Sequence, residues 1–292
     1  MKILKIIGIT LISLAILAFG FIYLKINDAS DRLNASYTIE PQKLEISNDS
    51  LSLAIGEKWV TALCAECHGE DLGGKLFFDD PSIGKVYSPN ITPGPGGTAY
   101  YSDADWVRAL RHGVAANGKA LFIMPSGDYN YMNEEDLAAT IAFIKNVPPI
   151  ERENGINQLT TLANVLISTG GFGEHAIPAE VIDHEAEIPK KPDSQSVIEY
   201  GDYVVKVFGC WSCHGKDLSG ANSPDPNAPP APSIRSSGKM GGYSFDQFQS
   251  FALNGKTTDG RELTGKFMPW MAIGRLPLEE QKAIFEYLKS LE

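Results

Sequence analysis

Several features common in enzymes and nucleic-acid-binding proteins are scarce in this sequence. Its 292 residues include 25 Lys and Arg against 36 Asp and Glu, which gives a net charge of −11. Nucleic-acid surfaces need clustered basic residues, so this balance argues against them and favours partners that present basic patches. No Ser–His–acid arrangement and no phosphate-cradling glycine loop is evident, and strand-like alternation is nearly absent. We therefore expect a mostly helical protein without catalytic residues.

Charge is absent altogether from residues 6–24. As a helix this run spans about 28 Å, close to the ~30 Å hydrocarbon core of a bilayer. Lys2 and Lys5 precede it, so the positive-inside rule leaves the N-terminus in the cytoplasm and exports the rest. A cleaved signal peptide is the alternative, although its apolar region is usually about 7–15 residues and ends in an A-x-A-like site. We expect a single-pass anchor in the cytoplasmic (inner) membrane, with the remainder in the periplasm.

All four cysteines lie in two copies of one motif, CAECH and CWSCH. Exported cysteines usually form disulfides, and a redox-active CxxC or a zinc site would use the same residue types. A thioredoxin-like CxxC belongs to an alternating strand–helix pattern that neither copy shows. Adjacent Cys and His residues rarely serve one tetrahedral zinc ion well, and the two copies lie far apart in the sequence.

Attachment of c-type haem accounts for every position of the motif. The two thiols form thioethers with the haem vinyl groups, and the next histidine ligates the iron. The sequence therefore predicts two covalently attached haem c groups. The attachment cysteines would be Cys64, Cys67, Cys210 and Cys213, and the iron-ligating histidines would be His68 and His214.

The repetition extends well beyond the cysteines. Each motif follows a glycine and an aromatic residue, as GEKWV or GDYVV, and precedes a PSI triplet, an amphipathic stretch, a Met-Pro pair and a closing helix. A lone methionine is more often core filling than a ligand. Because Met124 and Met268 occupy equivalent places in the two copies, we predict that they are the distal iron ligands. The pattern leaves out Met132, Met240 and Met271.

Both copies resemble class I cytochrome c domains, which carry CxxCH on the first helix and a distal methionine near the last. The segment GKVYSPNITPGPGG at residues 84–97, followed by YSDADWVRALRHG, resembles the multihaem cytochrome subunits of membrane-bound alcohol and gluconate dehydrogenases. The resemblance covers residues 50–149 well and 197–292 more loosely. Members of that family typically carry three CxxCH motifs, whereas this chain carries two.

The resemblance implies supporting roles for further residues. A glycine of the first helix should let an aromatic of the last helix pack closely, which pairs Gly56 with Phe143 and Gly201 with Tyr287. A proline carbonyl should accept the other N–H of each ligating histidine, with Pro81 and Pro232 as candidates. Two roles are open for Asn90, Thr92 and Trp106. They would either form hydrogen bonds with the haem propionates or serve as ordinary loop and core residues.

The expected fold is mostly α, with two tandem class I cytochrome c domains behind one transmembrane helix. The predicted boundaries are an anchor at 1–25, a tether at 26–48, domain 1 at 49–150, an interdomain connector at 151–196 and domain 2 at 197–292. The connector contains one short helix candidate, TTLANVLIS, and the isolated histidines His175 and His184. For these two and for His112 we expect solvated or structural roles.

These predictions describe a membrane-anchored dihaem cytochrome rather than an enzyme. If both irons carry His and Met, neither has a position open to substrate, and the protein would relay single electrons between redox partner proteins. The partners would be a dehydrogenase, a quinol-oxidising complex or a terminal oxidase. A dihaem peroxidase and a haem gas sensor are the alternatives, and each needs one absent or displaceable distal ligand.

Overall fold

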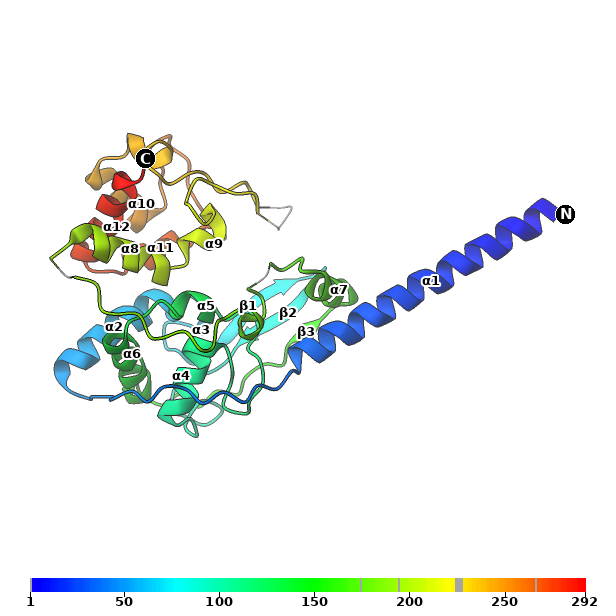
Figure 1. The fold of residues 1–292 in the computed structure, drawn as a ribbon, viewed down its shortest axis with the longest axis horizontal. Coiled ribbons are helices and arrows are strands. Elements are labelled where there is room, and N and C mark those ends of the chain that lie inside the picture. The colour runs from blue at the N-terminus through cyan, green and yellow to red at the C-terminus, as the bar shows by residue number, and fades with distance from the viewer. Residues whose placement is uncertain (1, 174, 194, 224–227, 266) are drawn as a thin grey trace.

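Two helical units lie against each other, and one long helix projects away from them (Figure 1). The computed structural model describes residues 2–173, 175–193, 195–223, 228–265 and 267–292. We call the unit that contains α2 to α6 domain 1 and the unit that contains α8 to α12 domain 2. Within the described residues the fold is mostly helical, as predicted.

The projecting helix is α1 (Lys2–Leu33). An 18-residue window in it has a mean hydropathy of 2.4, so it is long and apolar enough to cross a membrane, a property that anchors and signal sequences share. The helix continues into the segment predicted as a tether, and its last turns pack on α7 (Thr161–Thr169). Ala29 is fully buried there, and Arg32 Nη2 lies 2.6 Å from Glu180 Oε2.

Domain 1 is built from helices whose ends the sequence marks clearly. Asn133 caps the closing helix by accepting a hydrogen bond from the Asp136 N–H at 3.1 Å. Ser102 caps the amphipathic helix through a capping box with Asp105. The helices are α2 (Ser50–Leu63), α3 (Ala65–His68), α4 (Asp103–His112), α5 (Ser126–Tyr129) and α6 (Glu134–Asn146).

Domain 2 repeats this order. Its closing helix begins directly after Pro277, which is the N-cap residue. The left-handed glycine that ends the amphipathic helix recurs as well, at Gly113 in domain 1 and Gly255 in domain 2. The elements are α8 (Val197–Val207), α9 (Cys210–His214), the 3₁₀ turn η2 (Lys239–Gly242), α10 (Phe245–Asn254), α11 (Trp270–Gly274) and α12 (Leu278–Ser290).

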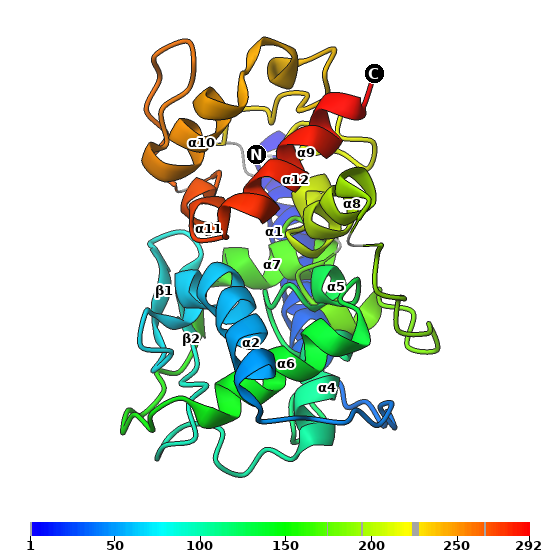
Figure 2. The same cartoon turned by 90° about the vertical axis from the view of Figure 1, so that its left-hand side faces the viewer.

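The first and last helices of each domain pack across each other (Figure 2), and a glycine of the first helix lies at each crossing. A Cβ on Gly56 would lie 2.1 Å from the Ala139 carbonyl oxygen and 2.7 Å from Phe143 Cβ. A Cβ on Gly201 would meet the Ala283 carbonyl oxygen at 2.1 Å and Tyr287 Cβ at 2.6 Å. The two predicted glycine–aromatic pairs are therefore confirmed, because the backbones approach too closely for any side chain.

A small antiparallel sheet in domain 1 was not anticipated. Strands β1 (Lys75–Asp80) and β2 (Gly84–Ser88) form a hairpin directly after the first CxxCH motif. The connector adds β3 (Gln158–Leu159) to the free edge of β2. Short pairs of this kind leave little periodicity in the sequence, which is why alternation did not reveal them.

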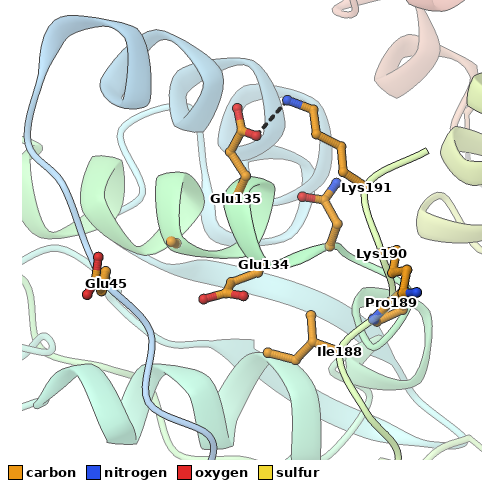
Figure 3. A pocket seen from close by; sticks show the side chains of 9 residues that line it. Glu45, Glu134, Glu135, Ile188, Pro189, Lys190 and Lys191 are labelled. Atoms are coloured by element: carbon orange, nitrogen blue, oxygen red, sulfur yellow. Dashed lines mark hydrogen bonds and ion pairs between the residues drawn. The ribbon is translucent and has the colours of Figure 1, made fainter. Parts of the chain in front are cut away.

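The connector packs against domain 1. It forms α7, as predicted, and the 3₁₀ turn η1 (Pro178–Glu180), and then crosses the N-terminal end of α6. A surface pocket forms at that crossing between Glu45, Glu134 and residues 188–191 (Figure 3). The Lys191 ammonium closes one side with a 2.5 Å ion pair to Glu135, so this pocket is a charged seam between segments rather than a cofactor site.

The two domains meet through reciprocal contacts. Lys58 on α2 of domain 1 lies 2.9 Å from Glu280 in the first turn of α12. The equivalent residue of domain 2, Tyr203 on α8, donates a 2.5 Å hydrogen bond to Asp136 in the first turn of α6. Likewise α11 packs on α2, and α5 packs on α8. Each domain thus presents the same elements to the other, as in an isologous pair.

Candidate haem-binding sites

The first CxxCH motif sits where α2 passes into the short helix α3. Cys64 ends α2 and precedes α3, and His68 ends α3 before a left-handed Gly69 turns the chain away. His68 is 7% exposed, and its Nδ1–H donates to the Pro89 carbonyl at 2.8 Å. This bond fixes the ring and leaves Nε2 with the lone pair that a metal requires. Burial lowers the pKa of His68, which favours the neutral, ligating imidazole.

The second motif repeats this geometry. His214 is 6% exposed, and its Nδ1–H donates to the Pro232 carbonyl at 2.7 Å. In both copies the loop after the histidine contains a leucine with left-handed backbone, Leu72 with φ +58° and Leu218 with φ +63°. Left-handed leucine is strained, so its recurrence at equivalent places indicates one loop design used twice.

One of the two proline predictions is confirmed and the other is wrong. Pro232 accepts from His214 as expected, but Pro89, not Pro81, accepts from His68. Pro81 lies in the turn between β1 and β2, outside the hydrogen-bonding reach of the motif. The hairpin inserted into domain 1 shifted the true equivalent of Pro232 by several residues, and the matching PSI letters at Pro81 were coincidental.

The four cysteines differ in burial: Cys64 is buried, Cys67 and Cys210 are half-buried, and Cys213 is exposed. Burial raises the thiol pKa of Cys64 to about 12 and that of Cys210 to about 12. None of the four cysteines forms a disulfide in the structure. Among the described residues no group of three or more His, Cys, Asp and Glu side chains converges as a metal site would require. Zinc therefore does not fit these residues, and a porphyrin-held iron does.

The predicted distal methionines occupy matching positions in the fold. Met124 and Met268 each precede a proline that is the N-cap of a short helix, α5 or α11, and each is half-buried at the edge of the core. The backbone repeats too, because the carbonyls of both methionines accept 2.8 Å bonds two residues ahead. Met132 and Met240 lie in the core at 1% and 5% exposure, where they fill space. The ligand assignment itself stays a prediction.

Asn90 and Thr92 hold their loop against the start of the connector through hydrogen bonds. The Asn90 amide donates to the Ile150 carbonyl at 2.8 Å, and the Thr92 hydroxyl accepts from the Ile150 N–H at 2.9 Å. Asn90 also accepts from the Thr92 N–H at 2.9 Å. These bonds engage both side chains within the loop and the start of the connector, so the packing alternative explains them. Trp106 is buried against Tyr101.

The isolated histidines have structural contacts. His184 donates from Nε2 to the Ala179 carbonyl at 3.1 Å, so its Nδ1 accepts from the His112 Nδ1–H at 3.2 Å. Burial lowers the pKa of His112 to about 4, which keeps the His112 ring neutral. The pair ties the end of α4 to the connector, and His112 is buried rather than solvated. His175 stacks edge-on against Trp211 of the second motif, with ring centroids 4.9 Å apart.

Comparison with known proteins agrees with this geometry. The family model described as Cytochrome c matches residues 53–148 and again 199–292. The cytochrome c subunit of the quinone-dependent alcohol dehydrogenase of Gluconacetobacter polyoxogenes is 28% identical over 78% of this chain and 53% of its own length. The gluconate 2-dehydrogenase cytochrome c subunit of Pantoea cypripedii is 33% identical over 52% of this chain and 35% of its own.

A relative of similar length is a protein named diheme cytochrome c-type from Cereibacter sphaeroides. It is 27% identical over 77% of this chain and 81% of its own length. The chain spans about half or less of the dehydrogenase subunits that it matches. The two family matches and the two motifs that they contain together imply two covalent haem c groups. This chain belongs to the cytochrome c family and is a dihaem c-type cytochrome.

Proposed function

We propose that the protein relays single electrons at the outer, periplasmic face of the cytoplasmic membrane, with α1 as its anchor. The observation that carries the proposal is the repeated pairing of a proline-fixed histidine with a methionine before the closing helix. When bound, each haem supplies a one-electron Fe(III)/Fe(II) couple. The residues of the chain hold the ring orientation of the histidine and present a thioether sulfur. With both ligands in place, no coordination position is left for a substrate.

The partners that suit this role are other redox proteins. Relatives of the chain are named as cytochrome c subunits of alcohol and gluconate dehydrogenases. A dehydrogenase is therefore a fitting donor, and a quinol-oxidising complex or terminal oxidase would be the other partner. The net charge of −11 favours basic docking surfaces on these partners, since opposite charges accelerate encounter.

Replacing Met124 or Met268 by alanine should open one iron to added ligands. The haem affected should lose its sulfur-to-iron absorption band, and its reduction potential should fall, because the thioether stabilises ferrous iron. Both haems should remain covalently attached, since the thioethers to cysteine do not involve methionine. The measurement is a visible spectrum and a potentiometric titration of each variant, with carbon monoxide added to the reduced protein.

Met132→Ala and Met240→Ala are the matched controls, because both side chains are core residues. They should lower stability and leave both sulfur bands in place. The proposal is overturned if the unmodified reduced protein binds carbon monoxide at one haem or turns over peroxide. Either result would mean a vacant distal position and would favour the enzyme or sensor alternatives.

The anchor has its own test. A chain that begins at Lys25 behind a cleavable export signal should be soluble and carry two haems, whereas the full chain should need detergent. Beginning at Leu33 instead would remove Ala29 and Arg32 from their contacts with α7 and Glu180, and should lower stability by about 1–3 kcal/mol. N-terminal sequencing of native material decides the matter: a mature terminus beyond Leu24 would show a cleaved signal.

A further inference from the structure

The short helix α5 of domain 1 touches both haem-attachment motifs. Its Tyr129 is buried and donates a 3.4 Å hydrogen bond to the carbonyl of Leu63, the residue before Cys64. The preceding residue, Asp128, points the other way, across the domain interface. Its carboxylate lies against Gly209, the residue before Cys210. The four-residue helix α5 therefore contacts the chain just before each of the two motifs.

The contact between Asp128 and Gly209 is close. A Cβ on Gly209 would lie 2.2 Å from Asp128 Oδ2 and 2.4 Å from its Cγ. Gly209 also has φ +61°, and it has no counterpart in the shorter junction between α2 and Cys64 of domain 1. The glycine thus makes room for the carboxylate at the start of the second motif.

The carboxylate is poorly compensated in this position. It is partly buried, and none of the described residues donates a hydrogen bond to it. Burial accordingly raises the pKa of Asp128 to about 7. Its charge acts on the second motif: after burial, Asp128 is the next cause of the raised pKa of Cys210, whereas the raised pKa of Cys64 follows from burial and Cys67.

We propose that Asp128, a residue of domain 1, sets the reduction potential of the haem held by domain 2. The inference rests on the proposed relay function. A ferric haem carries one more positive charge than a ferrous haem, so a nearby, partly buried carboxylate stabilises the oxidised form and lowers the reduction potential. The equivalent residue of domain 2 is Ala272, which has no charge to offer domain 1. Domain 2 instead places a cation at the first motif, because Arg275 at the end of α11 lies beside Glu66 and Glu70.

This position also couples electron uptake to a proton. Reduction of the second haem removes a positive charge, so Asp128 binds a proton more readily in the reduced protein. The pKa of Asp128 is therefore higher in the reduced protein than in the oxidised protein. At pH values between these two pKa values, the reduction potential of the second haem falls as the pH rises. Charged or titratable groups around α5 include Tyr129, His175, the Asp202–Lys206 ion pair and Arg111, which donates to the carbonyl of Asn130 at the end of α5. The second motif itself contains Cys210, Cys213 and His214.

The test is a potentiometric titration of the full dihaem chain and its Asp128→Asn variant between pH 5 and 8. At pH 8 the reduction potential of the second haem should be higher in the variant than in the unmodified chain. The expected rise is about 59 mV, which is about a tenfold change in the equilibrium constant of a one-electron couple. Its dependence on pH should flatten, while the first haem moves far less. Loss of the sulfur band in Met268→Ala identifies which component belongs to domain 2.

Asp217→Asn is the matched control, since it removes the same charge from an exposed site near the same motif. Solvent screens that charge, so its shift should be small. A His175→Asn variant distinguishes the contribution of His175 to the pH dependence of the potential from that of Asp128. Equal shifts of both haems, or none, in Asp128→Asn with both sulfur bands intact would overturn the tuning and leave the relay standing. Absence of the sulfur bands in the unmodified protein would instead count against the relay.

Discussion

Replacing Cys64 and Cys67 together by serine should leave one covalent haem per chain, held by domain 2. Serine has no sulfur to form a thioether, so domain 1 loses its attachment while the second motif is untouched. Cys64 is 6% exposed within the core, so losing a haem attached there removes apolar contacts from that core. We therefore expect domain 1 also to unfold at a lower temperature. Mass spectrometry of the denatured protein counts the haems, and a thermal melt reports the stability.

Glu66→Gln is the control for that experiment, because it changes a residue between the two cysteines that attaches nothing. It should retain both haems. It removes one of the two acids beside Arg275, an exposed contact worth at most about 1 kcal/mol. Two haems on the serine variant would show that the attachment cysteines are wrongly assigned.

Gly201→Ala should abolish the native packing of domain 2. The helix propensity of alanine is more favourable than that of glycine by about 1 kcal/mol, and this difference by itself would stabilise α8. Its Cβ, however, would lie 2.1 Å from the Ala283 carbonyl oxygen, and a backbone atom cannot rotate away. Separating α8 from α12 should cost about 3 kcal/mol or more, so the clash outweighs the propensity. Thermal unfolding followed by circular dichroism measures the difference.

Gly242→Ala provides the comparison, since nothing lies within 4 Å of a Cβ at that glycine. It should change stability by less than about 0.5 kcal/mol. A Gly201→Ala protein as stable as the Gly242→Ala protein would mean that the helix crossing is looser than the structure describes.

The sequence predicts well those parts of the fold that are local or repeated. Asn133 marks the start of α6, and the recurrence of Gly56 and Gly201 identifies the helix crossings, because each signal is contained within a few residues. The histidine partner in domain 1 was misplaced, since the β1–β2 hairpin interrupts the correspondence between Pro89 and Pro232. The identical PSI triplets at Pro81 and Pro232 do not reveal such an insertion.

Contacts between the domains lay beyond sequence reasoning for a different reason. The bond from Tyr203 to Asp136 and the contact of Asp128 with Gly209 join residues far apart in the chain. Each depends on how two finished surfaces fit, which neither periodicity nor capping chemistry encodes. The contact between His112 and His184 is similar, because isolated histidines in a sequence give no indication of each other.

The reciprocal contacts between the domains have an evolutionary consequence. An ancestral one-haem protein that paired with itself in this manner would have placed the same residue at both equivalent positions, so its two haems would have been identical. Fusion of two gene copies removes that constraint. Only then can one half carry Asp128 where the other carries Ala272, and one half Tyr131 where the other carries Arg275. Joining the copies thus allowed selection to act separately on the two haem-binding sites.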